Sequence, residues 1–89
     1  MPIFRKSNRK DKKYNVVTPG GKTVHFGSSR YGQYKDSTGL GLYTNLDHND
    51  KKRQKRYLAR AKGIKNKDGE LTWNDKESPN YYSINYLWT

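Results

Sequence analysis

Residues 13–27 read KYNVVTPGGKTVHFG, two short runs rich in β-forming residues on either side of a turn. Pro19 fixes φ at the start of the turn, and the two glycines after it permit positive φ. Alternate residues of a strand share one face, so the stretch predicts a β-hairpin from about Tyr14 to Phe26. His25 then lies on the open face, where a lone histidine is more often a surface or packing residue than a ligand. Four side chains are expected to point toward a core: Tyr14, Val16, Val24 and Phe26.

A helix is expected further along the chain, where DHND precedes a long basic run. Asp47 or Asn49 can accept bonds from the first free N–H groups, and Asp50 is favourable at the positive end of the helix dipole. Gly63 is a typical C-terminal stop, so we predict a helix from about Asn49 to Lys62. Its apolar face is expected to contain Tyr57, Leu58, Ala61 and Ile64, with Gln54 on the same side.

A second helix is predicted close to the C-terminus. Ser78 is a good N-cap and Pro79 a favourable first helical residue, and the helical pattern continues to about Trp88. Large apolar side chains recur there at helical spacing, which indicates contacts with a core. These side chains are Tyr81, Ile84, Leu87 and Trp88.

The segment between the hairpin and the first helix, residues 28–46, contains glycines and shows little periodicity. GLGL at 39–42 lacks the Gly-Lys-Ser/Thr of a phosphate-binding loop and the strand that would lead into it, so no nucleotide site is predicted. We expect a long loop that packs onto the domain. The side chains expected to hold it are Tyr31, Tyr34, Leu40, Leu42 and Tyr43.

The chain has 89 residues, enough for one small domain whose core must rest on a few large side chains. Eight tyrosines, two tryptophans and two phenylalanines supply that volume. The predicted fold class is α+β, a small single compact domain at residues 14–89 with an N-terminal β-hairpin plus two helices. Residues 1–13 are expected to form a basic extended arm outside this domain, because their positive charges repel one another.

Nineteen basic residues against eight acidic ones give a formal charge of +11. Such a field attracts polyanions, and nucleic acid, DNA in the first place, is the expected partner because neutralised phosphates release condensed counterions. Few of the nearby side chains suit base-edge readout, so we expect weak sequence preference. Tyr31, Tyr34 and Tyr43 are expected to pack in the core, with stacking on unpaired bases as the alternative. The predicted phosphate-binding residues are Arg5, Lys6, Arg9, Lys10, Lys12, Lys13, Arg30, Lys51, Lys52, Lys55, Arg56, Arg60 and Lys62.

Asp47, His48 and Asp50 admit two interpretations. Metal-dependent nucleases hold Mg²⁺ or Zn²⁺ with such residues and use the metal to activate water. The structural interpretation needs fewer assumptions: Asp47 caps the helix, Asp50 meets its dipole, and His48 packs or bonds locally. We therefore predict a protein that is not an enzyme and needs no metal or cofactor, and we keep a metal-dependent nuclease as the third hypothesis.

The chain contains no cysteine, which excludes a disulfide framework and thiolate metal sites. The N-terminal stretch MPIFRKSNRKDKKY has no apolar run of signal-peptide length, and no segment is apolar enough to cross a bilayer. We expect a protein that is not secreted and has no membrane partner. The oligomeric state stays open.

The order KTVHFG, RYGQYKD, LDHNDKKRQKRYLAR and SPNYYSINYLW resembles a family of short, basic, mostly uncharacterised proteins encoded by large double-stranded DNA viruses of algae and amoebae. The resemblance extends from about Lys13 to Trp88 and leaves the basic arm outside, while the insert STGLGLYTN departs from the pattern. It implies a viral origin, an α+β domain and a place in the virion or at the replication site in the host nucleus or cytoplasm. It also supports a second hypothesis, a minor capsid or capsid-lining protein whose arm threads between capsid subunits.

Overall fold

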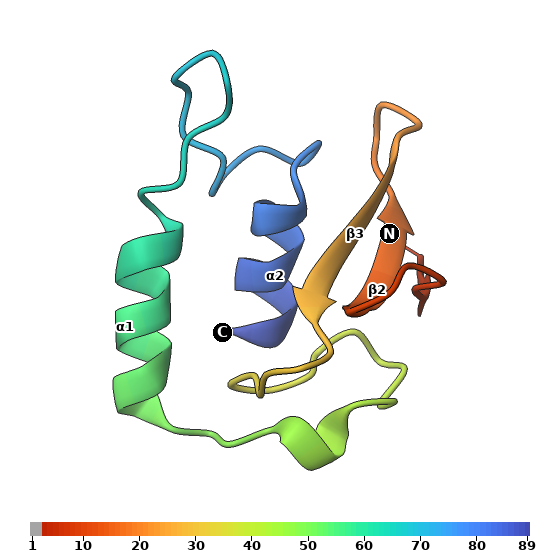
Figure 1. Cartoon of the computed structure of the whole chain (residues 1–89), viewed down its shortest axis with the longest axis vertical. Helices are drawn as coiled ribbons and strands as arrows, with labels where there is room; N and C mark the ends of the chain where they lie inside the picture. The colour runs from red at the N-terminus through yellow and green to blue at the C-terminus, as the bar shows by residue number, and fades with distance from the viewer. Residues whose placement is uncertain (1–2) are drawn as a thin grey trace.

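The computed structural model describes residues 3–89, and the predicted hairpin is present in it. Strand β2 (Lys12–Val17) pairs with strand β3 (Thr23–Ser28) in antiparallel register, with Tyr14 opposite Phe26 and Val16 opposite Val24 (Figure 1). This register places the four expected side chains on one face of the sheet, where each is at least 96% buried, with exposures of 0%, 0%, 4% and 1% for Tyr14, Val16, Val24 and Phe26. The hairpin prediction is confirmed.

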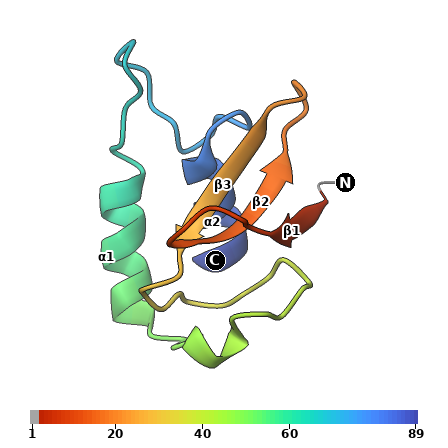
Figure 2. The same ribbon diagram turned by 45° about the vertical axis from the view of Figure 1, so that its right-hand side comes forward.

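The sheet has a third strand that the sequence analysis assigned to a free arm. Strand β1 (Phe4–Lys6) pairs antiparallel with β2, with Phe4 opposite Val16, and forms the edge of the sheet (Figure 2). The Phe4 ring lies edge-on to the rings of Phe26, at 5.7 Å, and Tyr86, at 4.5 Å. Burial of this ring outweighs the repulsion between the neighbouring cations, so the expected arm is wrong for the described residues of 1–13. Its first two positions lie outside the described residues.

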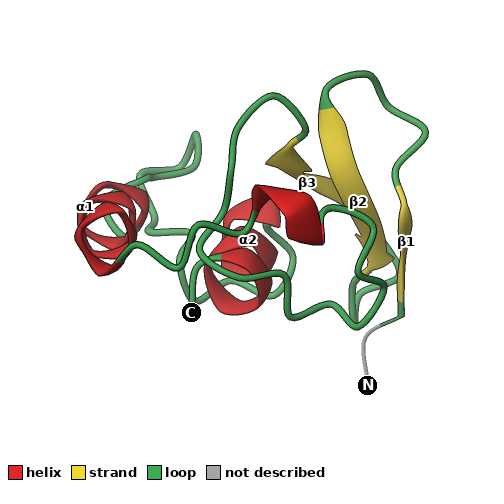
Figure 3. Cartoon of the chain, turned by 90° about the horizontal axis from the view of Figure 1, so that it is seen from below, coloured by secondary structure: helices red, strands yellow, loops and turns green. Residues whose placement is uncertain are grey.

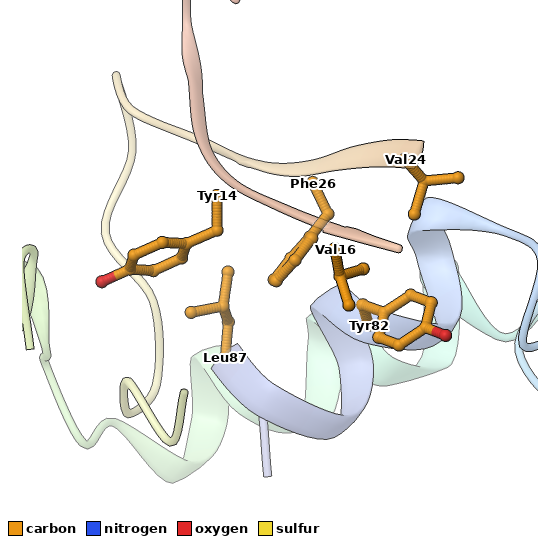
Figure 4. Packing of buried hydrophobic residues seen from close by; sticks show 6 residues of the cluster. All are labelled: Tyr14, Val16, Val24, Phe26, Tyr82 and Leu87. Carbon is orange, nitrogen blue, oxygen red and sulfur yellow. The ribbon is translucent and has the colours of Figure 1, made fainter. Parts of the chain in front are cut away.

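Helix α2 (Pro79–Leu87) covers the apolar face of the sheet and completes the core. It starts as predicted, with the Ser78 side chain accepting from the Asn80 N–H and proline at the first helical position. Figure 4 shows Tyr82 and Leu87 meeting the side chains of β2 and β3. Tyr82 was not expected in the core, whereas Tyr81 and Trp88, which were, are only partly buried.

Helix α1 (Lys51–Ala61) begins two residues later than the predicted start at Asn49 and is capped by a different residue. The Asp50 carboxylate accepts from the N–H groups of Lys52, at 2.9 Å, and Arg53, at 3.2 Å, so Asp50 is the N-cap and the predicted cap at Asp47 or Asn49 is wrong. Both bonds lower the pKa of Asp50, and the bond from the Arg53 N–H makes the larger contribution. Ile64 lies beyond the helix and is 47% exposed, so it is not part of the apolar face.

Helix α1 reaches the rest of the molecule through α2, which lies between α1 and the sheet (Figures 1 and 3). The rings of Tyr57 and Trp88 are stacked with centroids 4.1 Å apart and planes within 9°. The Gln54 amide donates to the Trp88 carbonyl at 3.0 Å, and the Asn80 amide donates to the Ala61 carbonyl at 2.8 Å. Gln54 therefore faces the domain, as predicted.

The long loop is held by buried polar contacts more than by the apolar side chains we expected. Gln33 is fully buried, and its amide nitrogen donates to the Tyr43 carbonyl at 2.8 Å and to the Asp47 carboxylate at 2.6 Å. Tyr31, Leu40 and Leu42 are 71%, 40% and 50% exposed, so the expectation that they pack down is wrong. The loop also contains the short 3₁₀ helix η1 (Thr44–Leu46).

The architecture is thus a three-stranded antiparallel sheet with two helices, which confirms the predicted α+β class. Along the described chain, neither helix has the length and apolar character needed to cross a bilayer.

Replacing Leu87, which is 1% exposed, by alanine should lower the free energy of unfolding by about 2–5 kcal/mol, because the cavity left under the sheet cannot collapse fully. Leu71→Ala is the matched control, since that side chain is 50% exposed and its loss should cost within about 0.5 kcal/mol. Urea unfolding followed by tryptophan fluorescence measures both. Equal losses in the two variants would contradict the assigned core.

Candidate nucleic-acid interface

An open cleft of about 720 Å³ lies between α1 and the ends of β2 and β3, with the C-terminal part of α2 along its floor. Its lining contains cations and aromatic rings from several elements but no acidic side chain. The lining residues are Lys12, Lys13, Gly27, Ser28, Tyr31, Gly32, Arg53, Arg56, Tyr57, Arg60, Ser83, Leu87 and Trp88.

Both walls of the cleft contribute exposed cations, three from α1 and one from β2. On α1, Arg53, Arg56 and Arg60 follow one another at three and four residues, the spacing that places side chains on one face of a helix. Lys12 faces them from β2. Only one of the three arginines has an acidic partner among residues 3–89, since Nε of Arg53 lies 3.7 Å from Oδ2 of Asp50 in an exposed pair. The charge of the cleft is therefore largely uncompensated.

Lys13 lies beneath the cleft and is not an exposed phosphate-binding residue, which corrects the sequence prediction. It is 1% exposed, and its Nζ donates to the Tyr31 carbonyl at 2.8 Å. Burial lowers the pKa of Lys13 to about 8, although the charges of Asp36 and Asp47 oppose this shift. Simple alternation along β2 does not explain this burial, because the adjacent Tyr14 is buried as well. The Lys13 side chain packs beside Gly27, where an added β-carbon would lie 3.3 Å from its Cβ and Cδ.

The other twelve predicted phosphate-binding residues are exposed, but only some of them converge. Lys12, Arg56 and Arg60 meet at the cleft. Arg30 pairs with Asp11 at 3.1 Å. The remaining exposed cations lie away from the cleft: Arg5, Lys6, Arg9, Lys10, Lys51, Lys52, Lys55 and Lys62.

Arg53 is the cleft residue that the sequence prediction missed. The signal in the sequence that points to Arg53 is the series of arginines at 53, 56 and 60, which recur along one face of the helix. Arginine rather than lysine at all three positions is itself informative, because a guanidinium binds phosphate through two parallel bonds and stacks on planar rings.

Aromatic rings form part of the cleft beside the arginines. The stacked pair of Tyr57 and Trp88 contributes to its floor, and the Arg60 guanidinium lies 5.9 Å from the Tyr57 ring. Burial raises the pKa of the Tyr57 hydroxyl, which keeps it neutral. At the opposite side Tyr31 is 71% exposed.

The two other tyrosines considered for stacking are engaged within the domain. The Tyr43 ring lies edge-on to Tyr14 with centroids 5.4 Å apart. The Tyr34 ring packs against His48 at 6.4 Å, and the Lys51 ammonium lies 5.7 Å from its centre. Tyr43 therefore packs against the core and Tyr34 packs against His48, whereas Tyr31 is exposed.

Asp47 organises the loop and does not cap the helix. Its Oδ1 accepts from the Gln33 amide at 2.6 Å and from the Asp36 N–H at 3.0 Å. Asp36 in turn accepts from the Tyr14 hydroxyl at 2.5 Å. Burial, reinforced by this bond, raises the pKa of Tyr14 to about 12, so the hydroxyl remains a donor. Asp47 therefore joins two parts of the loop, and Asp36 connects the loop to strand β2.

His48 packs and bonds locally, as the structural interpretation predicted. Its Nδ1 accepts from the Asp50 N–H at 2.9 Å, and its ring lies against Trp88 with centroids 5.2 Å apart. Its other ring nitrogen, Nε2, is buried and has no hydrogen-bond partner among the described residues. Across residues 3–89, no three His, Asp or Glu side chains lie close enough to hold a metal ion together.

Comparison with known proteins places the chain near an uncharacterised family. Residues 3–38 match the model of a family of unknown function, DUF5754. No curated protein matches the chain, and no solved structure does. The matched region contains β1, β2 and β3, so it includes the segment that the expected resemblance had left outside. Similarity to an uncharacterised family is therefore supported, over a shorter and more N-terminal part of the chain than residues 13–88.

The burial of Lys13 predicts a pH-dependent stability. Below about pH 8 Lys13 is protonated in both the folded and the unfolded chain, so the cost of burying its ammonium group lowers the free energy of unfolding in full. Between about pH 8 and 10.5 Lys13 is protonated only in the unfolded chain. Its contribution to the free energy of unfolding therefore rises with pH over this range.

Lys13→Met should therefore be more stable than the wild type at pH 7, by at most about 3 kcal/mol, and this advantage should shrink between pH 8 and 10.5. Lys12→Met is the matched control, because Lys12 is exposed and its loss should not change the pH dependence. Urea unfolding at several pH values provides the measurement. A Lys13→Met advantage that is the same at pH 7 and pH 10 would contradict a charged buried Lys13.

Proposed function

We propose that this protein binds nucleic acid, DNA in the first place, mainly through phosphate contacts in the cleft between α1 and the sheet. One observation carries the proposal: exposed cations from two separate elements line a single cleft that contains no acidic side chain. A phosphate backbone is the common ligand that supplies closely spaced negative charge to such a surface, and its binding gains free energy from counterion release. The formal charge of +11 adds long-range attraction.

Weak sequence preference follows from the same arrangement. Phosphate contacts position a nucleic acid but carry no direct sequence information. The amide of Gln54, which could have read a base edge, is occupied by the Trp88 carbonyl at 3.0 Å. Affinity should therefore depend on salt far more than on base sequence.

We propose a binding role without catalysis. The carboxylates of Asp36 and Asp47 are used in holding the loop, and Asp50 is used as the cap of α1. These engagements leave the cleft with cations that hold phosphate and without an acidic ligand set for a catalytic metal. Cleavage of DNA in the presence of Mg²⁺ by the purified protein would overturn this part of the proposal.

We further propose a viral setting, in which the protein acts in the virion or at the replication site in the host nucleus or cytoplasm. This rests on the resemblance to small basic proteins of large double-stranded DNA viruses. The match to DUF5754 is compatible with it but names no organism.

A minor capsid or capsid-lining role is the second candidate, and the open face of the sheet favours it. Ile3 and Val17 are 69% and 57% exposed beside Arg5 in a shallow hollow of about 370 Å³ next to the edge strand β1. Exposed apolar side chains beside an unpaired strand edge suit contact with another protein chain. Presence of the protein in purified, DNase-treated particles would favour this role over a free nucleic-acid binder.

The cleft is tested by two triple variants that remove equal charge. Arg53→Ala, Arg56→Ala and Arg60→Ala together should lower the slope of log affinity against log salt by about two to three, for duplex or single-stranded DNA, because three phosphate contacts are lost. Alanine favours the helix, so α1 should persist. Binding is measured by fluorescence anisotropy over a salt series, and circular dichroism checks the fold.

Lys52→Ala, Lys55→Ala and Lys62→Ala together form the matched control, since these three cations are exposed on α1 or at its C-cap but do not line the cleft. This variant should change the slope by clearly less than the arginine variant. Equal reductions in both variants would show that total charge, and not the cleft, governs binding.

A further inference from the structure

Tyr31 is an exposed aromatic side chain on a fixed backbone. The residue is 71% exposed and lines the cleft, whereas its carbonyl accepts from the buried Lys13 ammonium at 2.8 Å and its N–H donates to the Ser28 carbonyl at 3.3 Å. These two hydrogen bonds hold the main chain at Tyr31 against β3 and β2. A ring carried on an ordered main chain loses less conformational freedom on covering a flat ligand than a ring on a mobile loop.

The wall opposite Tyr31 is suited to the phosphate groups of a nucleic acid whose base covers the Tyr31 ring. Arg53, Arg56 and Arg60 are exposed along one side of α1 and line the same cleft. Guanidinium groups bind phosphate oxygens and also stack on bases. The combination of a cationic track with an exposed aromatic face is the arrangement by which proteins hold single strands without strong sequence preference.

A duplex cannot use the aromatic part of this surface. Its bases are covered on both faces by their neighbours and present only their edges in the grooves. The cleft, about 720 Å³, lies in the range of sites that enclose small ligands, roughly 300–1,000 Å³, so it accommodates an unstacked base with its phosphate. A duplex would contact the arginines at the rim through phosphates alone.

We propose that the cleft prefers single-stranded nucleic acid, with an unpaired base stacked on Tyr31 and the adjoining phosphates held by the arginines of α1. This inference rests on the proposed nucleic-acid binding and adds the class of strand that the cleft selects. The shared chemistry is an unpaired base on a phosphodiester backbone, whether the sugar is deoxyribose or ribose.

The test compares three ligands at the same length and salt: a thymidine oligonucleotide, a uridine oligonucleotide and a mixed-sequence DNA duplex. The wild type should bind at least one single strand more tightly than the duplex. Tyr31→Ala should weaken that binding between about fivefold and about a hundredfold and leave duplex affinity unchanged. Tyr31→Phe keeps the ring and should restore wild-type binding.

The two single strands separate the sources of the ligand. A similar response of both to Tyr31→Ala indicates recognition of the base and phosphate only, while a preference for one identifies the sugar that the cleft accepts. Because Tyr31 is exposed, its variants should retain the wild-type circular dichroism spectrum.

A second readout places the base in the cleft. In a Trp73→Phe background Trp88 is the one tryptophan left, and it lines the cleft floor. Its emission should change on binding the single strand and change less in Tyr31→Ala. Unchanged Trp88 emission during saturable binding would place the strand elsewhere and overturn the inference.

The possible failures are distinct. Salt-dependent binding of all three ligands with equal affinity, or an equal loss for all of them in Tyr31→Ala, overturns strand selection and leaves the proposed function standing. Absence of binding to every ligand at low salt overturns both.

Discussion

The packing of α2 against the apolar face of β2 and β3 is the contact on which the rest of this structure depends. The chain has few aliphatic residues, so a layer of large rings, with Tyr82 and Phe26 5.9 Å apart, fills the space between helix and sheet. Leu87 closes the layer so tightly that a β-carbon on Gly27 would lie 2.7 Å from it. Strand β1 packs on this core through the Phe4 ring. Helix α1 packs on it through contacts of Tyr57 and Gln54 with Trp88, at the end of α2.

This dependence explains where the cleft lies and why it is positive. One wall belongs to the sheet and the other to α1, and α2 fixes the distance between them. Cations on both walls repel one another, and the packing of α1 on Trp88 keeps them together despite that repulsion. A bound polyanion would relieve the repulsion, so the same contacts that organise the fold also shape the proposed binding surface. Lys13, buried beneath, increases the positive potential of the cleft below about pH 8.

The long loop shows how residues with catalytic character serve a structural task. Asp36 connects the loop to β2, while Gln33 and Asp47 join separate parts of the loop, through bonds of 2.5–3.0 Å. Because these groups are occupied, the loop can leave Tyr31 exposed without losing its own order. The acids that suggested a metal site thus position the surface on which nucleic acid is proposed to bind.

The sequence by itself determined the elements whose signals are local: the hairpin with its inward face, the start of α2 at Ser78 and Pro79, and the cationic character of α1. The tertiary structure alone decided the pairing of β1, the burial of Lys13, the role of Asp47 and the meeting of Lys12 with Arg53 at one cleft. Each of these depends on partners distant in the chain. Turn and cap preferences act within a few residues, whereas burial depends on which surface arrives from elsewhere, and a single sequence pattern carries no record of that.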